Sequence, residues 1–175
     1  MRGSRFIAGL LIGLGGLLLL TAAVLLYART RPAVSFPRVG SRLANFSLRD
    51  LDGNDIQLRD YSGKTVLINA WASWCPPCLA EMPMLVSEYR ARKGNGFVIL
   101  AINAGETPEE AVAFAAEYGM DFPVLLDPDS ALLDSLLIDS LPTSVLVGAD
   151  GVVKAVHIGM LSPEEFAAEF APLIP

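Results

Sequence analysis

Two cysteines separated by two prolines, in the run Trp74-Cys75-Pro76-Pro77-Cys78, constrain the fold of this chain more than any other feature. They follow a short, nearly continuous apolar run over residues 64–71 (KTVLINAW), which is typical of a buried central strand. They precede a segment from Pro76 to about Arg92 that we expect to be helical and to be interrupted by Pro83. The pair is therefore predicted to lie where a buried strand passes into the N-terminus of a helix.

This junction favours thiol chemistry at the pair. Unpaired N–H groups and the helix dipole at a helix N-terminus stabilise a thiolate, and a cysteine in such a motif titrates well below its reference pKa of about 8.5. We expect Cys75, which comes first and is the more exposed, to attack a disulfide, and Cys78 to resolve the mixed disulfide. Pro76 and Pro77 lack an N–H that could bond the thiolate, and they suit the first turn of a helix.

Other uses of two cysteines fit the sequence less well. A structural zinc site needs four ligands, and the chain has two cysteines and one histidine, His157, so no metal is expected. Covalent haem attachment needs a histidine after the second cysteine, and that residue is Leu79. An inert disulfide over three residues would close a small loop and stabilise little. The prediction is a redox-active Cys75–Cys78 pair without a cofactor, with the inert disulfide as the alternative.

The N-terminal segment is predicted to be a separate unit. Phe6–Tyr27 holds 22 residues without a charge, enough to cross a hydrocarbon core of about 30 Å as a helix. The run is longer than the apolar region of a secretory signal and ends in bulky and then basic residues. We predict a transmembrane signal anchor over residues 1–28 and a linker over residues 29–40, with a cleaved signal peptide as the alternative.

Charge is unevenly distributed along the chain. All 19 acidic residues lie at or after Asp50, so the segment from Leu43 onward carries 7 bases against 19 acids, a net charge of −12. A domain this acidic is a poor candidate for binding nucleic acid or anionic lipid surfaces. No nucleic-acid partner is therefore expected.

Residues 41–175 are predicted to form one α/β domain. Alternating apolar residues around Asp52-Gly53 indicate a β-hairpin. Helix starts with capping signals are expected at Thr107 and Ser162. Further strands are expected over residues 97–102, 122–126, 143–147 and 152–158, and a further helix over residues 130–137. This alternation predicts a sheet flanked by helices, with antiparallel strands at one end.

The motif and its surroundings resemble the membrane-anchored TlpA/ResA-like branch of the thioredoxin superfamily. The similarity rests on residues 71–78 (WASWCPPC) and 79–83 (LAEMP). Further matches are residues 101–106 (AINAGE), 122–127 (FPVLLD), 141–143 (LPT) and 148–151 (GADG). The resemblance extends from about Val39 to the C-terminus. It implies a thioredoxin-like fold, in which a central mixed sheet is flanked by helices, with an N-terminal β-hairpin and an αβ insertion over residues 107–126.

The resemblance also implies an acid–base residue. Ordinary thioredoxins have a buried aspartate behind the active site, and this chain has Asn69 there. The TlpA/ResA-like branch instead has a glutamate three residues after the second cysteine, which is Glu81. A partly buried carboxyl could accept the Cys78 proton. The alternative is an exposed glutamate that complements the helix dipole.

A client-binding surface is implied as well. Pro142, preceded by Leu141, resembles the cis-proline of the family, whose neighbouring backbone would pair with a client strand around the target cysteine. Trp74 would shape the exposed docking surface, whereas Trp71 is expected inside. The binding residues are then Trp74, Pro76, Pro77, Leu141, Pro142 and Thr143.

The predicted function is that of an extracytoplasmic thiol–disulfide oxidoreductase, held in the cell membrane by a single N-terminal helix. The resemblance implies that it reduces disulfides in client proteins such as apocytochrome c during cytochrome c maturation. Because the chain has no nicotinamide or flavin motif, electrons must come from another thiol protein, and the resemblance implies a membrane donor of the CcdA/DsbD type. The alternatives are a thiol oxidant or isomerase, and a chaperone that holds redox or metal-site precursors without turnover.

Overall fold

The computed structural model of the chain describes residue 21 and residues 36–175, and every structural statement below concerns those residues. Apart from Thr21, the predicted anchor lies outside the described residues, as do residues 29–35 of the predicted linker. Within the described part, no helix combines the length and the apolar character that crossing a membrane requires.

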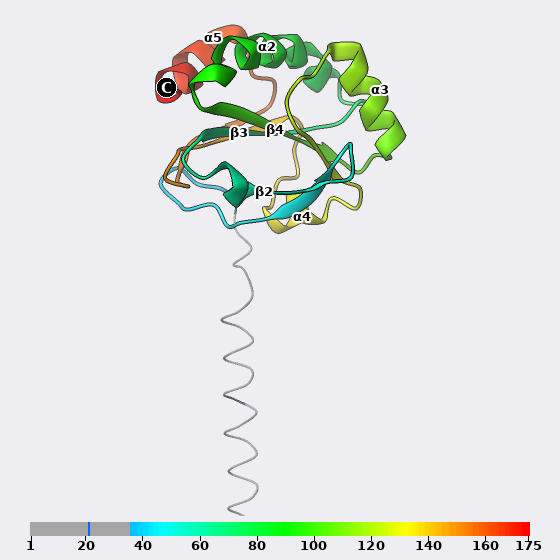
Figure 1. The fold of residues 1–175 in the computed structure, drawn as a ribbon, viewed down its shortest axis with the longest axis horizontal. Helices are drawn as coiled ribbons and strands as arrows, with labels where there is room; N and C mark the ends of the chain where they lie inside the picture. The colour runs from blue at the N-terminus through cyan, green and yellow to red at the C-terminus, as the bar shows by residue number, and fades with distance from the viewer. Residues whose placement is uncertain (1–20, 22–35) are drawn as a thin grey trace, which may run out of the picture. The chain divides into compact units, whose positions relative to one another are not determined.

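A seven-stranded mixed sheet forms the centre of the domain, in the order β2-β1-β5-β4-β3-β6-β7 (Figure 1). The strands are β1 (Ser47–Asp50), β2 (Asp55–Gln57), β3 (Thr65–Trp71), β4 (Phe97–Ala104), β5 (Val124–Asp127), β6 (Thr143–Val147) and β7 (Val153–Ile158). Strands β3, β4 and β5 are parallel. The predicted mixed sheet is confirmed, but antiparallel pairs lie at both edges rather than at one. The reason is that the β1–β2 hairpin joins β5 on one side, while β6 and β7 join β3 on the other.

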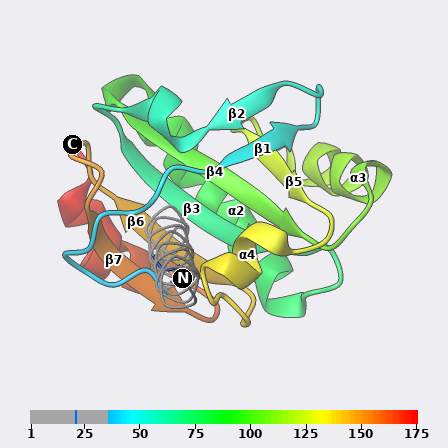
Figure 2. The same ribbon diagram turned by 90° about the horizontal axis from the view of Figure 1, so that it is seen from below.

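Helices cover both faces of this sheet. They are α2 (Pro76–Arg92), α3 (Pro108–Tyr118), α4 (Ala131–Ser135) and α5 (Pro163–Glu165), with shorter helical turns η1 (Leu58–Tyr61), η2 (Lys93–Asn95), η3 (Phe166–Phe170) and η4 (Ala171–Leu173). Figure 1 shows α2, α3 and α5 above the sheet and α4 below it. In the view from below, α4 lies in front of the sheet and α2 behind it (Figure 2).

Both faces of the central strands are therefore buried. Every residue of β3 and β4 is buried, and successive side chains enter opposite cores. Leu67 and Ile99 pack in the core beneath α2 and α3, whereas Ile68 and Leu100 pack in the core that includes residues of α4. Burial on two faces explains why these strands appear in the sequence as continuous apolar runs rather than alternating ones.

Capping residues set the helix boundaries. Thr107 and Ser162 each form a capping box with a glutamate three residues later, as the sequence predicts. Gly119 ends α3 in the left-handed region, with φ of 62°, a conformation that costs little only for glycine.

Helix α2 continues through Pro83, so the predicted interruption is wrong. A proline inside a helix removes one hydrogen bond to the carbonyl four residues earlier, which here is that of Leu79. Pro83 lies on the exposed side of α2, while Met82 and Leu85 are buried. The missing bond is thus on the side open to solvent, and burial of the opposite side keeps the helix intact.

Candidate active site

Cys75 and Cys78 form a disulfide, with an S–S distance of 2.07 Å, where the chain passes from β3 into α2. Cys75 is the N-cap of α2, and the backbone N–H of Cys78 donates a hydrogen bond to the Cys75 Sγ at 3.3 Å. Pro76 and Pro77 occupy the first two helical positions. The pair thus lies at the helix N-terminus that the sequence predicts, where the helix dipole stabilises negative charge on sulfur.

Cys75 is the more exposed of the two cysteines, as the sequence predicts, although the difference is small in the disulfide form. The whole residue is only 3% exposed, against 0% for Cys78, because its sulfur turns toward the first turn of α2 and bonds there. Cys75 still lines a groove of about 670 Å³, and Cys78 does not. A client sulfur that approaches along this groove meets Cys75 first.

The groove joins segments that are far apart in the sequence. Its walls come from the active-site turn (Trp74 to Pro77), from the end of β4 and its following turn (Ala104 and Gly105), and from residues around α4 that end at Leu141. Trp74 is 67% exposed beside it, whereas Trp71 is buried and packs against Phe114 with a ring-centroid distance of 4.4 Å.

Four of the six predicted binding residues line this groove: Trp74, Pro76, Pro77 and Leu141. The peptide bond between Leu141 and Pro142 is cis. Pro142 and Thr143 are buried behind the groove, where the Pro142 carbonyl accepts from the N–H of Gly159 at 2.8 Å and Thr143 Oγ1 donates to the Ser140 carbonyl at 2.7 Å. The backbone N–H and C=O of Leu141 have no hydrogen-bond partner among residues 36–175.

Glu81 is a buried acid behind the disulfide. It lies three residues after Cys78 in α2, on the same side of the helix, and it is 2% exposed. Burial raises its pKa from 4.5 to about 7, although hydrogen bonds from the Leu161 N–H and the Asn69 amide and the nearby His157 favour the charged form. The exposed first-turn position that was the alternative is therefore excluded.

Asn69 connects Glu81 to the sheet. From the middle of β3, its Nδ2 donates to Glu81 Oε1 at 2.8 Å and to Ser144 Oγ at 3.1 Å, and the Leu161 N–H donates to Glu81 Oε2 at 2.7 Å. The Asn69 Oδ1 is buried without a partner within the described range. The sequence pointed to Asn69 and Glu81 separately, but not to Ser144 or Leu161, which come from strands and loops distant in the chain.

A second buried acid, Glu106, holds the turn that precedes the cysteines. Its Oε2 accepts from the Ser73 N–H at 2.8 Å, and its Oε1 accepts a short hydrogen bond from the Ser73 hydroxyl. Asn103 Nδ2, at the end of β4, donates to the same carboxylate. The family resemblance includes Glu106 within residues 101–106 but assigns it no role, because its partner Ser73 is 33 residues away in the chain.

Together these features define the class of protein. The cysteine pair closes to a disulfide at a helix N-terminus and shares a groove with the residue before a cis-proline. It lies over a mixed sheet, with a buried carboxyl behind it. This arrangement is that of a thioredoxin-like thiol–disulfide redox domain.

Comparison with known proteins identifies the family. Residues 38–170 match the Redoxin family. The chain is 38% identical over 140 residues to the thiol-disulfide oxidoreductase ResA of Halalkalibacterium halodurans, covering 80% of this chain and 79% of that one. It is 35% identical over 161 residues to ResA of Geobacillus thermodenitrificans, covering 91% and 92%. The chain belongs to the Redoxin family and is a TlpA/ResA-like, thioredoxin-like protein-disulfide oxidoreductase.

Solved structures agree with this assignment. The thioredoxin domain of a thiol-disulfide oxidoreductase from Bacteroides vulgatus superposes with a TM-score of 0.69 at 26% identity, covering 78% of this chain and 98% of that chain. A thiol:disulfide interchange protein from Chlorobium tepidum gives a TM-score of 0.69 at 26% identity, covering 79% and 98%.

Proposed function

We propose that this oxidoreductase works in the reducing direction outside the cytoplasm. In this proposal residues 1–28 hold the chain in the cell membrane, and the domain reduces disulfides in client proteins, with apocytochrome c as the expected client. A disulfide-reducing domain is needed where thiols otherwise oxidise, which is the extracytoplasmic space. The similarity to ResA and the uncharged run Phe6–Tyr27 support this proposal.

The reaction begins on the reduced enzyme with a Cys75 thiolate. It attacks one sulfur of the client disulfide, that S–S bond breaks, and the other client sulfur leaves as a thiolate that takes up a proton. Cys78 then transfers its proton to Glu81 and attacks the Cys75 sulfur. The mixed disulfide breaks, the second client sulfur leaves and takes the proton back from Glu81, and the Cys75–Cys78 disulfide forms. Two electrons have then passed from the enzyme to the client, with one proton from Cys78 and one from solvent.

The buried carboxyl of Glu81 is the observation that carries the proposal. Cys78 is fully buried, so water does not serve as its base, and Glu81 lies one helical turn away with a pKa of about 7. A group that titrates near the working pH both accepts and returns a proton efficiently. Such a base speeds resolution by Cys78, the step that completes the reduction of a client.

The groove gives the client its position. An extended client segment beside Leu141 would find a backbone N–H and C=O that are free to pair with it, in the manner of an added strand. Trp74 offers an exposed apolar surface next to Cys75. This pairing would recognise backbone rather than sequence, so the reactive client disulfide is selected mainly by its access to the groove.

The spent disulfide must be reduced again. A dithiol in a membrane protein of the CcdA/DsbD type is the proposed donor, because a disulfide can accept electrons from a thiol partner by the same exchange chemistry. The same groove would then admit the donor's cysteine, since Cys75 is the sulfur that it reaches.

The reduction potential of the Cys75–Cys78 couple tests the direction. Equilibration of the full chain in mild detergent with glutathione or dithiothreitol buffers, followed by thiol alkylation, gives the ratio of dithiol to disulfide. We expect a potential well below that of periplasmic oxidants. A value near about −120 mV, typical of a strong oxidant, would overturn the proposal in favour of an oxidant. Binding of clients without insulin reduction would favour the chaperone alternative.

A further inference from the structure

A second cavity lies at the opposite end of the central strands from the cysteines. It has a volume of about 360 Å³. Val66 near the start of β3 and Val147 at the end of β6 line it. The other end of β3 leads into the active-site turn, and the start of β6 follows Leu141. Val66 and Trp71 are five positions apart in β3, which corresponds to about 17 Å. The cavity is therefore remote from the thiol chemistry.

Unpaired positive charge gathers at this cavity. Residues 36–175 contain nine basic side chains. Five of them, Arg49, Arg90, Arg92, Lys93 and Lys154, form ion pairs with carboxylates. The other four, Arg38, Arg42, Arg59 and Lys64, have no carboxylate partner in that part of the chain. Arg42, Arg59 and Lys64 line the cavity, and Arg38 precedes Arg42 in the same exposed turn.

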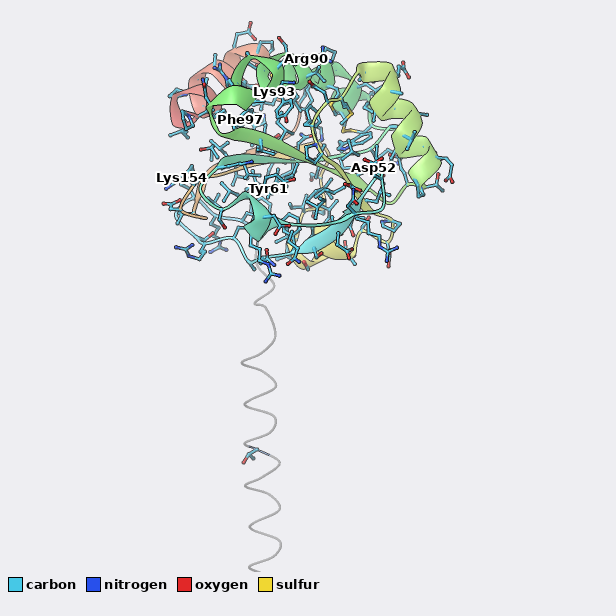
Figure 3. The ribbon with its side chains drawn as sticks, viewed as in Figure 1. Asp52, Tyr61, Arg90, Lys93, Phe97 and Lys154 are labelled. Atoms are coloured by element: carbon cyan, nitrogen blue, oxygen red, sulfur yellow. A yellow bond between two sulfur atoms is a disulfide. The ribbon has the colours of Figure 1, made fainter. Side chains whose placement is uncertain are left out.

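The geometry holds these cations at the rim. The Arg42 guanidinium donates to the backbone carbonyl of Asp150 at 2.6 Å, and the Lys64 ammonium lies 5.5 Å from the centre of the Tyr61 ring. Both cationic side chains remain exposed. The one carboxylate in the cavity lining, that of Asp150, is already bound by Lys154 at 2.8 Å. Figure 3 labels Tyr61, the ring that Lys64 approaches, and Lys154, the partner of Asp150.

An exposed apolar residue flanks the cations. Val39 is 67% exposed, in the turn that Ser41 closes through hydrogen bonds to the Arg38 carbonyl. The N–H of Gly40 donates to the Val153 carbonyl at 2.9 Å, which fixes this turn against β7. Cations around a shallow cavity, with an exposed apolar side chain beside them, match the chemistry of a phospholipid headgroup above its acyl region.

We propose that this basic face, Arg38, Arg42, Arg59 and Lys64, docks on anionic phospholipid headgroups and turns the active site away from the membrane while the domain acts on clients; the face is released when the membrane donor reduces the disulfide. The inference rests on the membrane anchor of the proposed function. If the anchor ends at residue 28, seven residues separate it from Phe36, and the eight Cα–Cα steps reach at most about 29 Å. The basic face begins two residues later, so a linker of this length allows it to reach the lipid surface. The domain as a whole is too acidic to bind anionic lipid by its net charge. Its 19 acids would be repelled by the surface, so an anchored domain approaches it only through this basic face.

Hydrogen exchange of the full chain in lipid nanodiscs tests the orientation. We expect amides of residues 58–64 and 148–152 to exchange at least about fivefold more slowly in discs with 30% phosphatidylglycerol than in discs of phosphatidylcholine alone. The reason is that each basic side chain near an anionic surface adds to the free energy of binding. Arg59→Glu with Lys64→Glu should abolish this difference.

The matched control is Arg90→Glu with Lys93→Glu. It makes the same change in charge, but Arg90 and Lys93 lie on the opposite side of the sheet from Tyr61, as Figure 3 shows. The control should keep the slower exchange. Equal loss in both double variants would show a general effect of net charge, and equal exchange in the two kinds of disc would show no docking. Either result would overturn the proposal.

A free anion is the competing ligand. Inorganic phosphate at 10 mM, added to phosphatidylcholine discs, should leave exchange unchanged; the same protection with phosphate alone would overturn lipid docking in favour of a small-anion site.

Two measurements separate this test from the proposed function. Co-elution of the chain with the discs reports on the anchor, and insulin reduction by Arg59→Glu with Lys64→Glu, expected at the wild-type rate, reports on the thiol chemistry.

Discussion

The side-chain amide of Asn69 in β3 donates a 2.8 Å hydrogen bond to the carboxylate of Glu81 in α2. This bond joins the position where ordinary thioredoxins have an aspartate to the glutamate that follows the second cysteine. An asparagine cannot take up a proton, so of these two side chains only Glu81 can carry the proposed proton transfer. The amide instead fixes the direction of the carboxylate, together with the Leu161 N–H that donates to its other oxygen.

Replacing Glu81 by glutamine should slow the resolving step. The variant keeps the size of the side chain but cannot accept the Cys78 proton, so we expect client reduction at pH 7 to fall by about 10²-fold, a usual contribution of a general base. The wild-type rate should rise with pH as Glu81 loses its proton near pH 7, and this rise should be absent in the variant. Stopped-flow measurement of insulin or client reduction over pH 5–9 checks both. An unchanged rate and an unchanged pH profile would remove Glu81 from the mechanism.

The same carboxyl should make the disulfide form less stable at neutral pH than at acid pH. Its pKa is raised in the folded protein from 4.5 to about 7, so the folded state holds the proton that the unfolded state has released. The stabilising contribution is complete below pH 4.5 and is lost as the pH rises through about 7, an effect of about 3 kcal/mol. Urea unfolding of oxidised wild type and Glu81→Gln should show the loss in the wild type only. A parallel pH dependence in the two proteins would contradict it.

Glu106→Gln should loosen the turn before the cysteines. The amide of glutamine would place a donor against three donors, the N–H and O–H of Ser73 and the amide of Asn103, and a buried polar group without a partner costs about 1–3 kcal/mol. We expect a matching loss of thermal stability and slower reduction of small disulfides. Glu109→Gln, on the exposed first turn of α3, is the control and should change neither. Equal stability of the two variants would deny Glu106 this positioning role.

Much of the fold followed from local signals. The hairpin at Asp52-Gly53, the apolar runs that become β3 and β4, and the cap at Thr107 all depend on residues close in the chain. The position of the β1–β2 hairpin next to β5 could not be predicted, because a hairpin sequence fixes its own turn and not its neighbour in a sheet. Pro83 was misjudged for a similar reason, since burial of the far side of α2 outweighs the lost hydrogen bond.

The sequence predicts those parts of the site that lie in one continuous segment. It does not predict the contacts that the fold forms between distant segments. The cysteine pair, Glu81 and Trp74 are visible in one continuous segment. Leu161, which binds Glu81, is 80 residues away in the chain. Ser73, which binds Glu106, follows β3, whereas Glu106 follows the neighbouring strand β4. No periodicity or motif links such positions. The small exposure of Cys75 likewise depends on the direction of one side chain, which residue order does not specify.

Trp74→Ala should weaken recognition of protein clients without affecting the fold. The indole is 67% exposed next to Cys75, so its removal leaves no cavity in the core. We expect kcat/KM for a protein client to fall about tenfold, as for an exposed aromatic anchor, while reduction of a small aromatic disulfide and the unfolding temperature stay unchanged. Val112→Ala, a truncation of an exposed side chain on α3, is the control. A similar loss with the small disulfide would show that Trp74 acts on Cys75 and not on the client.

Cys78→Ser should trap clients and donor on Cys75. Without Cys78 the mixed disulfide has no internal thiol to attack it, so the complex persists until an external thiol reaches the groove. Cells that express the full chain with this variant should accumulate species sensitive to dithiothreitol, and the same chain with Cys75→Ser should accumulate fewer, because Cys78 does not line the groove. Recovery of a membrane dithiol protein and of proteins with a Cys-x-x-Cys-His motif would support the proposed function. Recovery of broadly secreted proteins would favour an oxidant or isomerase, and equal trapping by both variants would contradict the assignment of Cys75 as the attacking residue.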